Sequence, residues 1–267
     1  NSDGFTIGAD SANGEQNLSG ESYVSWCWKA GGSASNNTTG DITASQSANA
    51  TAGFSISTFN TSGQSGTMTC GHGLGAVPKF IIIKPYDTSD DWYVYHSSMT
   101  NDRYIRLNQE NAETTNDATW ALTTPTSSVF SIGAGFWGAN SNGLLCYAFS
   151  EVRGYSKFGA YQGNGQTDGV FVFCGFQPSL VIIKRTGGNG DWEVLDNKRL
   201  GYNPRVETLA TNNSSAEGNY NRIDILSNGF KVRSSSGNVN TSNGDYIFLA
   251  FAQNPLVTST GVAGTAR

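Results

Sequence analysis

The sequence PKFIIIK at residues 78–84 returns 100 positions later as PSLVIIK at residues 178–184. Each copy begins with a proline and holds four consecutive apolar residues, most of them β-branched, which favours a strand over a helix. Because apolar side chains fall on both faces of such a strand, we expect a central strand that is covered on both sides. The repetition itself makes internal repeats the first question to ask of this chain.

Other segments recur in the same register. An Asp-Trp pair at 91–92 returns at 191–192, and SSVF at 127–130 returns as SNGF at 227–230. Turn-forming Gly, Ser, Asn and Asp clusters separate seven short strand-like segments in the first copy. These segments are expected at 53–59, 66–70, 79–85, 92–96, 104–107, 129–132 and 144–151. About seven strands in about 100 residues indicate an all-β fold of tandem, jelly-roll-like β-sandwich repeats.

The repeat divides the chain into five parts. Residues 1–28 end in GESYVSWCW, which is similar to residues 244–251, so we expect the C-terminal part of a preceding repeat there. Residues 29–52 contain almost no large apolar side chain, which favours a Gly/Ser/Asn-rich linker or loop. The first full repeat is expected at 53–153, the second at 154–256, and a C-terminal tail at 257–267.

Composition excludes several classes of protein. The chain has 16 basic and 21 acidic residues, a net charge of −5 and no basic run, which argues against nucleic-acid binding. No segment reaches the roughly 18 to 20 apolar residues of a membrane span, so no membrane insertion is expected. Four cysteines, none in a C-x-x-C pair, lie in alternating apolar runs, which favours buried free thiols. They are Cys27, Cys70, Cys146 and Cys174.

Residues that could perform catalysis are few. The two histidines, His72 and His96, have no metal-type spacing, and Asp196 replaces His96 in the second copy. A glycosidase would need two carboxylates across a cleft, and the candidates for such a pair are Asp87, Asp90, Asp91, Glu151 and Asp191. The same acidic turns could hold calcium, but the second copy keeps a single carboxylate there. We favour turn-stabilising roles, and expect no enzymatic activity, metal or cofactor.

Aromatic residues are the remaining chemical resource, with 6 Trp, 11 Tyr and 14 Phe. Trp92 and Trp192 occupy equivalent places in the two copies, so we expect both to be core anchors. Aromatic residues in loops without an obvious equivalent could instead stack on sugar rings or fill a partner's pocket. The candidate ligand-binding residues are Trp137, Tyr86, Tyr202 and Tyr220.

Several motifs together resemble a known family. They are YSKFG (155–159), GNG (163–165), GFQP (175–178), IIKR (182–185), YVSWCWKAGG (23–32), GHGLGAVPKFIIIK (71–84) and VTSTGVAGTAR (257–267). This set is similar to a repeat domain of unassigned function in marine bacteriophage tail-fibre-like and virion structural proteins, often beside concanavalin- or laminin-G-like jelly rolls. The resemblance implies a virion part assembled in the host cytoplasm, and a natural C-terminus at Arg267. It carries over no catalytic residue.

The functional expectation combines the resemblance with the composition. A non-enzymatic repeat module at the distal part of a tail fibre or similar appendage would contribute to host-surface attachment. Expected partners are copies of itself, with a trimer favoured, other virion proteins, and a host-surface glycan or protein. Two alternatives stay open. One is a self-assembling capsid-decoration or filament subunit joined by donated strands, and the other is a polysaccharide depolymerase.

Overall fold

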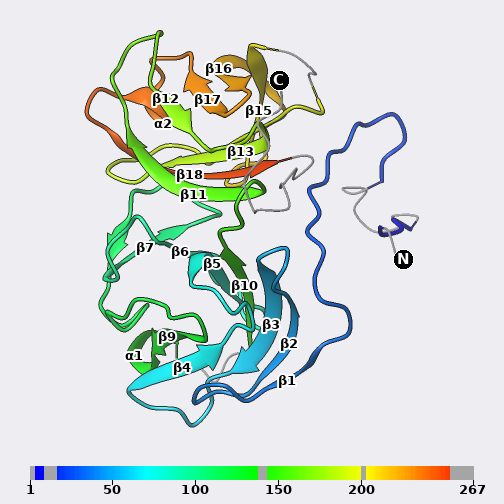
Figure 1. Cartoon of the computed structure of the whole chain (residues 1–267), viewed down its shortest axis with the longest axis vertical. Coiled ribbons are helices and arrows are strands. Elements are labelled where there is room, and N and C mark those ends of the chain that lie inside the picture. The colour runs from blue at the N-terminus through cyan, green and yellow to red at the C-terminus, as the bar shows by residue number, and fades with distance from the viewer. Residues whose placement is uncertain (1–3, 9–16, 138–142, 200–202, 253–267) are drawn as a thin grey trace.

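A computed structural model of the chain describes residues 4–8, 17–137, 143–199 and 203–252 (Figure 1). The all-β class is confirmed, because two one-turn helices, α1 (Ala134–Trp137) and α2 (Gly237–Asn240), are the only α-helices in those ranges. Every pair of strands in the described sheets is antiparallel. None of the described helices has the length and apolarity needed to cross a membrane.

The strands form two eight-stranded sheets and one strand pair. The first sheet, in spatial order, is β1 (Ser35–Asn37), β2 (Ala44–Asn49), β3 (Phe54–Asn60), β10 (Gly143–Ser150), β5 (Pro78–Pro85), β6 (Tyr93–His96), β7 (Arg103–Arg106) and β8 (Thr114–Thr115). The second is β11 (Ser156–Gln162), β18 (Asp245–Ala252), β13 (Pro178–Arg185), β14 (Glu193–Asp196), β15 (Arg205–Ala210), β16 (Gly218–Leu226), β17 (Gly229–Val232) and β12 (Phe171–Phe173). The pair is β4 (Thr67–Gly71) with β9 (Val129–Gly133).

The two sheets share a run of strands in the same order. In the first sheet β10 lies between β3 and β5, followed by β6 and β7, and in the second β18 lies between β11 and β13, followed by β14 and β15. The pairing of β4 with β9 likewise has its counterpart in β12 with β17. All seven strands expected in the first copy are present, each within one residue of its expected start.

The expectation of a linker or loop at residues 29–52 is wrong for residues 35–37 and 44–49, which form β1 and β2. Small and polar residues are buried there because their side chains find hydrogen-bond partners. Gln46 Nε2 donates to the Gly71 carbonyl at 3.0 Å, and Ser47 Oγ donates to the Gly32 carbonyl at 2.6 Å. The sheet therefore extends beyond the expected first repeat.

Three apolar cores hold the molecule together. One lies inside the first half, around Ile81, Ile83 and Phe130, and one lies inside the second half, around Ile183 and Phe230. The third is formed between the two large sheets, and its buried members are Phe54, Phe80, Val94, Ile105, Phe149, Phe158, Leu180, Trp192, Val194, Ile247, Leu249 and Phe251. The central strands therefore bury both faces, as their sequence predicts.

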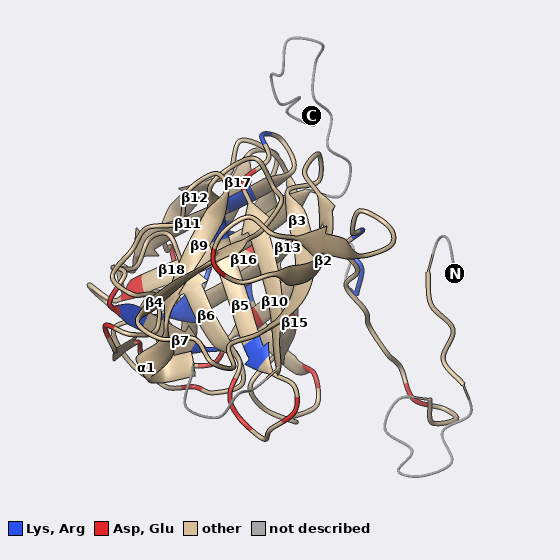
Figure 2. Cartoon of the chain, turned by 90° about the horizontal axis from the view of Figure 1, so that it is seen from below, with Lys and Arg blue, Asp and Glu red and all other residues tan. Residues whose placement is uncertain are grey.

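Charged side chains take little part in these cores. Figure 2 shows a chain that is uncharged along most of its length, with many of its acidic residues in loops. An exception is the ion pair of Glu193 with Arg222, whose Nη2 lies 2.9 Å from the Glu193 carboxylate. Burial raises the pKa of Glu193, and the Arg222 guanidinium acts in the opposite direction.

Candidate functional site

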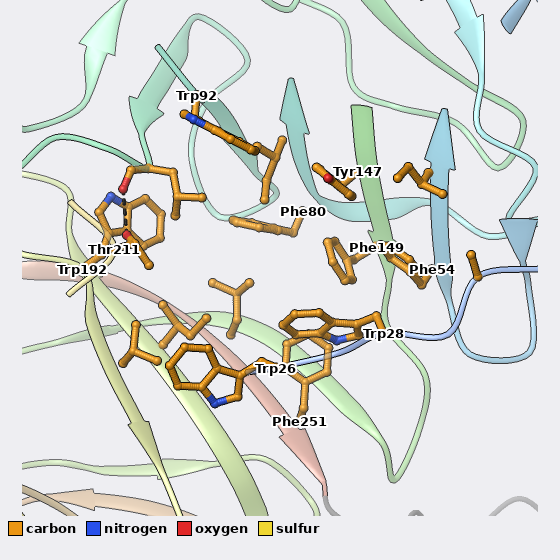
Figure 3. A pocket seen from close by; sticks show the side chains of 17 residues that line it. Trp26, Trp28, Phe54, Phe80, Trp92, Tyr147, Phe149, Trp192, Thr211 and Phe251 are labelled. Atoms are coloured by element: carbon orange, nitrogen blue, oxygen red, sulfur yellow. Dashed lines mark hydrogen bonds between the residues drawn. The ribbon is translucent and has the colours of Figure 1, made fainter. Parts of the chain in front are cut away.

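The third core encloses a cavity of about 500 Å³ between the two large sheets (Figure 3). Aromatic and aliphatic side chains from both sheets and from the N-terminal segment surround it. The lining residues are Trp26, Trp28, Ala30, Phe54, Ile56, Phe80, Ile82, Trp92, Leu107, Tyr147, Phe149, Ile182, Trp192, Val194, Thr211, Leu249 and Phe251. None of them has a carboxylate, an imidazole or an amine, so the cavity is suited to apolar contact rather than to proton transfer.

Strand alternation builds this lining. In β5, Ile81 and Ile83 point into the core of the first half, whereas Phe80 belongs to the core between the sheets and Ile82 lines the cavity. The second sheet follows the same rule, because successive side chains of a strand point to opposite faces. The four apolar residues at 80–83 therefore contribute to two cores, one on each face of the strand.

Three aromatic rings from distant parts of the chain meet at one side of the cavity. Trp28 lies with its ring centroid 5.7 Å from that of Phe149 and 5.3 Å from that of Phe251. Phe149 and Phe251 are themselves 6.0 Å apart, in an edge-to-face arrangement. The segment at residues 20–30 therefore packs against both sheets, and its blue trace runs beside them in Figure 1.

In each half, one asparagine side chain makes hydrogen bonds to both residues of the repeated Asp-Trp pair. Asn108 donates to the Asp91 carboxylate at 2.9 Å and accepts from the Trp92 backbone N–H at 3.0 Å. In the second half Asn212 makes the equivalent bonds, to Asp191 at 2.7 Å and from Trp192 N–H at 2.8 Å. Each asparagine therefore fixes the tryptophan that immediately precedes the strand, before β6 in the first half and before β14 in the second.

The two tryptophans differ in burial. Trp192 has no exposed surface, and its indole N–H donates to the Arg106 carbonyl of the other half at 2.8 Å. Trp92 is half-buried and stacks on Tyr147 with ring centroids 6.5 Å apart. The expectation of core anchors therefore holds fully for Trp192 and in part for Trp92, which faces the open side of the cavity.

Further hydrogen bonds tie the loop after β7 to the turn between β13 and β14. Lys184 Nζ donates to the Glu110 carbonyl at 2.9 Å and to the Gly190 carbonyl at 2.7 Å. Burial lowers the pKa of this Lys184 ammonium to about 8. In addition, the Glu113 N–H donates to the Thr186 carbonyl at 2.9 Å. The Lys184 ammonium and a main-chain hydrogen bond therefore both join the two halves.

Both histidines are buried and make structural hydrogen bonds. His96 Nδ1 accepts from Ser98 N–H at 3.1 Å, which leaves Nε2 to donate to the Phe248 carbonyl at 3.3 Å, across the contact between the halves. Burial lowers the pKa of His96 to about 4. His72 makes a similar pair of contacts, with Leu74 N–H and the Thr126 carbonyl, and burial lowers its pKa also.

Four of the five candidate carboxylates contact donors from their own half, and Glu151 instead contacts donors of β11 in the second half. Asp91 pairs with Arg106 at 2.8 Å, and Glu151 pairs with Lys157 at 2.9 Å. Asp87 accepts from Gly143 N–H at 2.7 Å, and Asp90 accepts from the Tyr93 hydroxyl at 2.8 Å. Within the part of the chain that the structure describes, no group of three His, Cys, Asp or Glu residues could hold a metal ion.

The four aromatic residues proposed from sequence do not form one site. Trp137 is buried in the first core, where its indole N–H donates to the Thr119 carbonyl at 2.8 Å, so we withdraw it as a surface contact. Tyr86 is 60% exposed beyond β5, and Tyr220 is 55% exposed on β16 of the other sheet. Tyr202 lies outside the described residues. The sequence did not reveal the grouping of Trp26 and Trp28 with the two Asp-Trp pairs.

The cysteines follow the sequence expectation except at one position. Cys70, Cys146 and Cys174 are buried free thiols, and burial raises the pKa of Cys70 and of Cys174 to about 12. Cys27 is exposed, which corrects the expectation for that residue. It lies between the two tryptophans that line the cavity, on the opposite side of an extended segment.

Comparison with known proteins gives one result. A family model described as a domain of unknown function, DUF7483, matches residues 1–255. No curated protein and no solved structure matches the chain. The match spans the N-terminal segment, both sheets and all residues of the cavity, and the chain therefore belongs to the DUF7483 family.

Proposed function

We propose that this chain is a non-enzymatic structural module of a bacteriophage tail fibre or similar virion appendage, built from two copies of one β-sandwich unit. The sequence repeat and the common order of strands in the two sheets support the duplication. The resemblance described above supports the virion setting. In this proposal the chain assembles in the host cytoplasm and acts in the virion, as part of a trimer that contacts other virion proteins.

The observation that carries the proposal is the way in which the two halves are joined. Twelve buried side chains form a core between the sheets, and main-chain hydrogen bonds cross the same contact. A flexible linker would let two domains swivel, whereas a shared apolar core fixes their orientation. Fixed orientation between successive units is what an extended appendage needs to transmit force and to hold its tip away from the particle.

Attachment to a host surface is the second part of the proposal. Tyr86 and Tyr220 present exposed rings, and the Arg222 guanidinium lies 4.6 Å from the Tyr220 ring centroid. A ring backed by a cation can contact a sugar face and its hydroxyl groups. Each contact would be weak, and several copies on one particle would supply the strength.

The test combines assembly state with binding. Light scattering measures the mass of the chain in solution, and trimers are the expected result. The chain displayed at high valency should bind host cells, and Y86A with Y220A should reduce that binding at least tenfold. L122A serves as a matched control, because Leu122 is 57% exposed and has no role in the proposed host binding. Host binding that is absent at every valency would overturn the adhesive part, and open-ended filaments would favour self-assembly as the function.

A further inference from the structure

An extended segment at residues 20–30 has one face on the molecule and one face in solvent. Val24, Trp26, Trp28 and Ala30 are half-buried, and the residues between them are exposed. Trp26 and Trp28 line the cavity, and the indole of Trp28 contacts Phe149 and Phe251. This alternation is typical of a strand that covers an apolar surface with one face and has its other face free to pack on a second surface.

The segment matches the last strand of each half, β10 and β18. Aligning SWCW (25–28) with CYAF (146–149) and FLAF (248–251) places Trp28 with Phe149 and Phe251, the three rings that meet beside the cavity. Three equivalent residues thus stand around one point, with ring centroids 5.3 to 6.0 Å apart. The sequence alignment and the packing agree on the same register.

The alignment also assigns a role to the exposed face. In β10, Cys146 and Ala148 point into the core of the first half, and in β18, Phe248 and Ala250 point into the core of the second. The aligned residues of the segment are Ser25 and Cys27, which face solvent here. The positions that point into the inner core of each half are therefore exposed to solvent in the segment.

The contact between the halves is directional, and one end of it is open. The end of β7 and the loop after it in the first half cover Trp192 and Lys184 of the second, both of which have no exposed surface. Their equivalents in the first half, Trp92 and Lys84, are half-buried, and the acceptors of Lys84 Nζ among the described residues are two carbonyls of its own turn, those of Pro85 and Thr88. If the two halves were related by a twofold axis, each half would cover the equivalent residues of the other. In a threefold arrangement each unit covers only the next one, so Trp92 and Lys84 are left to be covered by a third unit.

We propose that residues 20–30 are the closing strand of a third β-unit of the same kind, carried by the same polypeptide ahead of Gly20. The three units surround the aromatic cavity with pseudo-threefold symmetry. The third unit packs its core on Ser25 and Cys27, and its loop covers Trp92 and Lys84, as the first unit covers Trp192 and Lys184. This arrangement does not depend on a virion role.

Two natural side chains report on the proposed unit from opposite sides. Cys27 is the exposed thiol, the other three cysteines being buried, and Lys84 is the uncovered equivalent of buried Lys184. The experiment compares the natural full-length polypeptide with the 267-residue chain. Maleimide labelling of Cys27 and acetylation of Lys84 are followed by mass spectrometry under native conditions. Lys198, which is exposed in the second half, is the internal control.

The expected result is at least a 100-fold slower reaction at Cys27 and at least a tenfold slower reaction at Lys84 in the full-length polypeptide, with Lys198 unchanged. Equal rates in the two samples, or protection at only one of the two residues, would overturn the proposal. Protection of both residues in the 267-residue chain would also overturn it, because a second copy would then be the source. As an arm that does not depend on labelling, C27D should leave the melting temperature of the 267-residue chain unchanged and lower that of the full-length polypeptide.

Discussion

Acidification should destabilise this fold through His96, whose imidazole is fully buried at the contact between the halves. An ordinary histidine has a pKa of 6.5, and burial lowers the pKa of His96 in the folded chain to about 4. Above pH 6.5 the imidazole is neutral in both the folded and the unfolded chain, so it contributes no pH dependence. Between pH 6.5 and about 4 the unfolded chain binds a proton that the folded chain does not bind.

The free energy of unfolding therefore falls as the pH falls through this window, by about 1.4 kcal/mol per pH unit. The loss from His96 amounts to about 2 kcal/mol at pH 5 and about 3 kcal/mol at pH 4. This is a large share of the roughly 5 to 15 kcal/mol that stabilises a typical domain. Below the folded pKa both states are protonated, and the contribution no longer changes.

Urea unfolding followed by tryptophan fluorescence at pH 7, 6, 5 and 4.5 measures the effect. The H96N variant keeps an acceptor for Ser98 N–H and removes the proton, so its stability should depend on pH less than that of the wild type by the amounts above. H72N is the matched comparison for the other buried histidine. Carboxylates such as Glu193 titrate in both proteins and cancel in the difference. An H96N variant with the same loss between pH 7 and 4.5 as the wild type would refute the reasoning, as would an NMR titration of folded His96 near pH 6.5.

Four further substitutions test the packing. R222M leaves the buried Glu193 carboxylate without its cation and should cost about 3 to 5 kcal/mol in urea unfolding. W137A opens the first core and should cost about 3 to 5 kcal/mol by the same measurement, while host-cell binding per folded molecule stays unchanged. N212A should cost about 1 to 3 kcal/mol and more than N108A, because the Trp192 N–H that loses its acceptor is the more deeply buried; equal costs would contradict this role.

Most of the strands could be predicted from sequence because period-two patterns and turn residues are local signals. The pattern at residues 78–84 also predicted burial on both faces, and Ile81, Ile83 and Phe80 are nearly inaccessible to solvent. It did not predict which surfaces cover each face. That outcome depends on contacts between residues far apart in the chain, such as Phe80 with Phe158, whose rings stack at 6.1 Å.

The prediction failed where burial is polar. Residues 44–49 have no large apolar side chain, and their strand is stabilised by pairing with β3 and by side-chain amides such as Gln46, which accepts from Asn37 Nδ2 at 2.8 Å. Composition alone cannot distinguish such a strand from a linker, because both are rich in Ser, Asn and Ala. The difference lies in whether a neighbouring strand offers partners for the backbone.

Trp137 shows a limit of reasoning from repeats. It has no aromatic equivalent in the second half, which suggested a surface role. Its position is nevertheless repeated, because α1 and α2 end at the same place in each half, and Asn240 at the end of α2 is also fully buried. Asn240 Nδ2 donates to the carbonyls of Gln166 and Ser234 at 2.7 and 2.9 Å. The two halves thus have a buried residue at corresponding places, which packs in an apolar core in the first half and makes buried hydrogen bonds in the second.

The core between the sheets also constrains how the chain can fold. A sheet with two apolar faces exposes one of them in water until its partner arrives, which invites aggregation. Each half carries such a sheet, so neither is expected to be stable alone, and the two should unfold in one transition. The charge of an aspartate at Val194, which lies in the shared core, would therefore destabilise both halves together. Separate transitions in the V194D variant would contradict this reasoning, because each half would then be stabilised by its inner core alone.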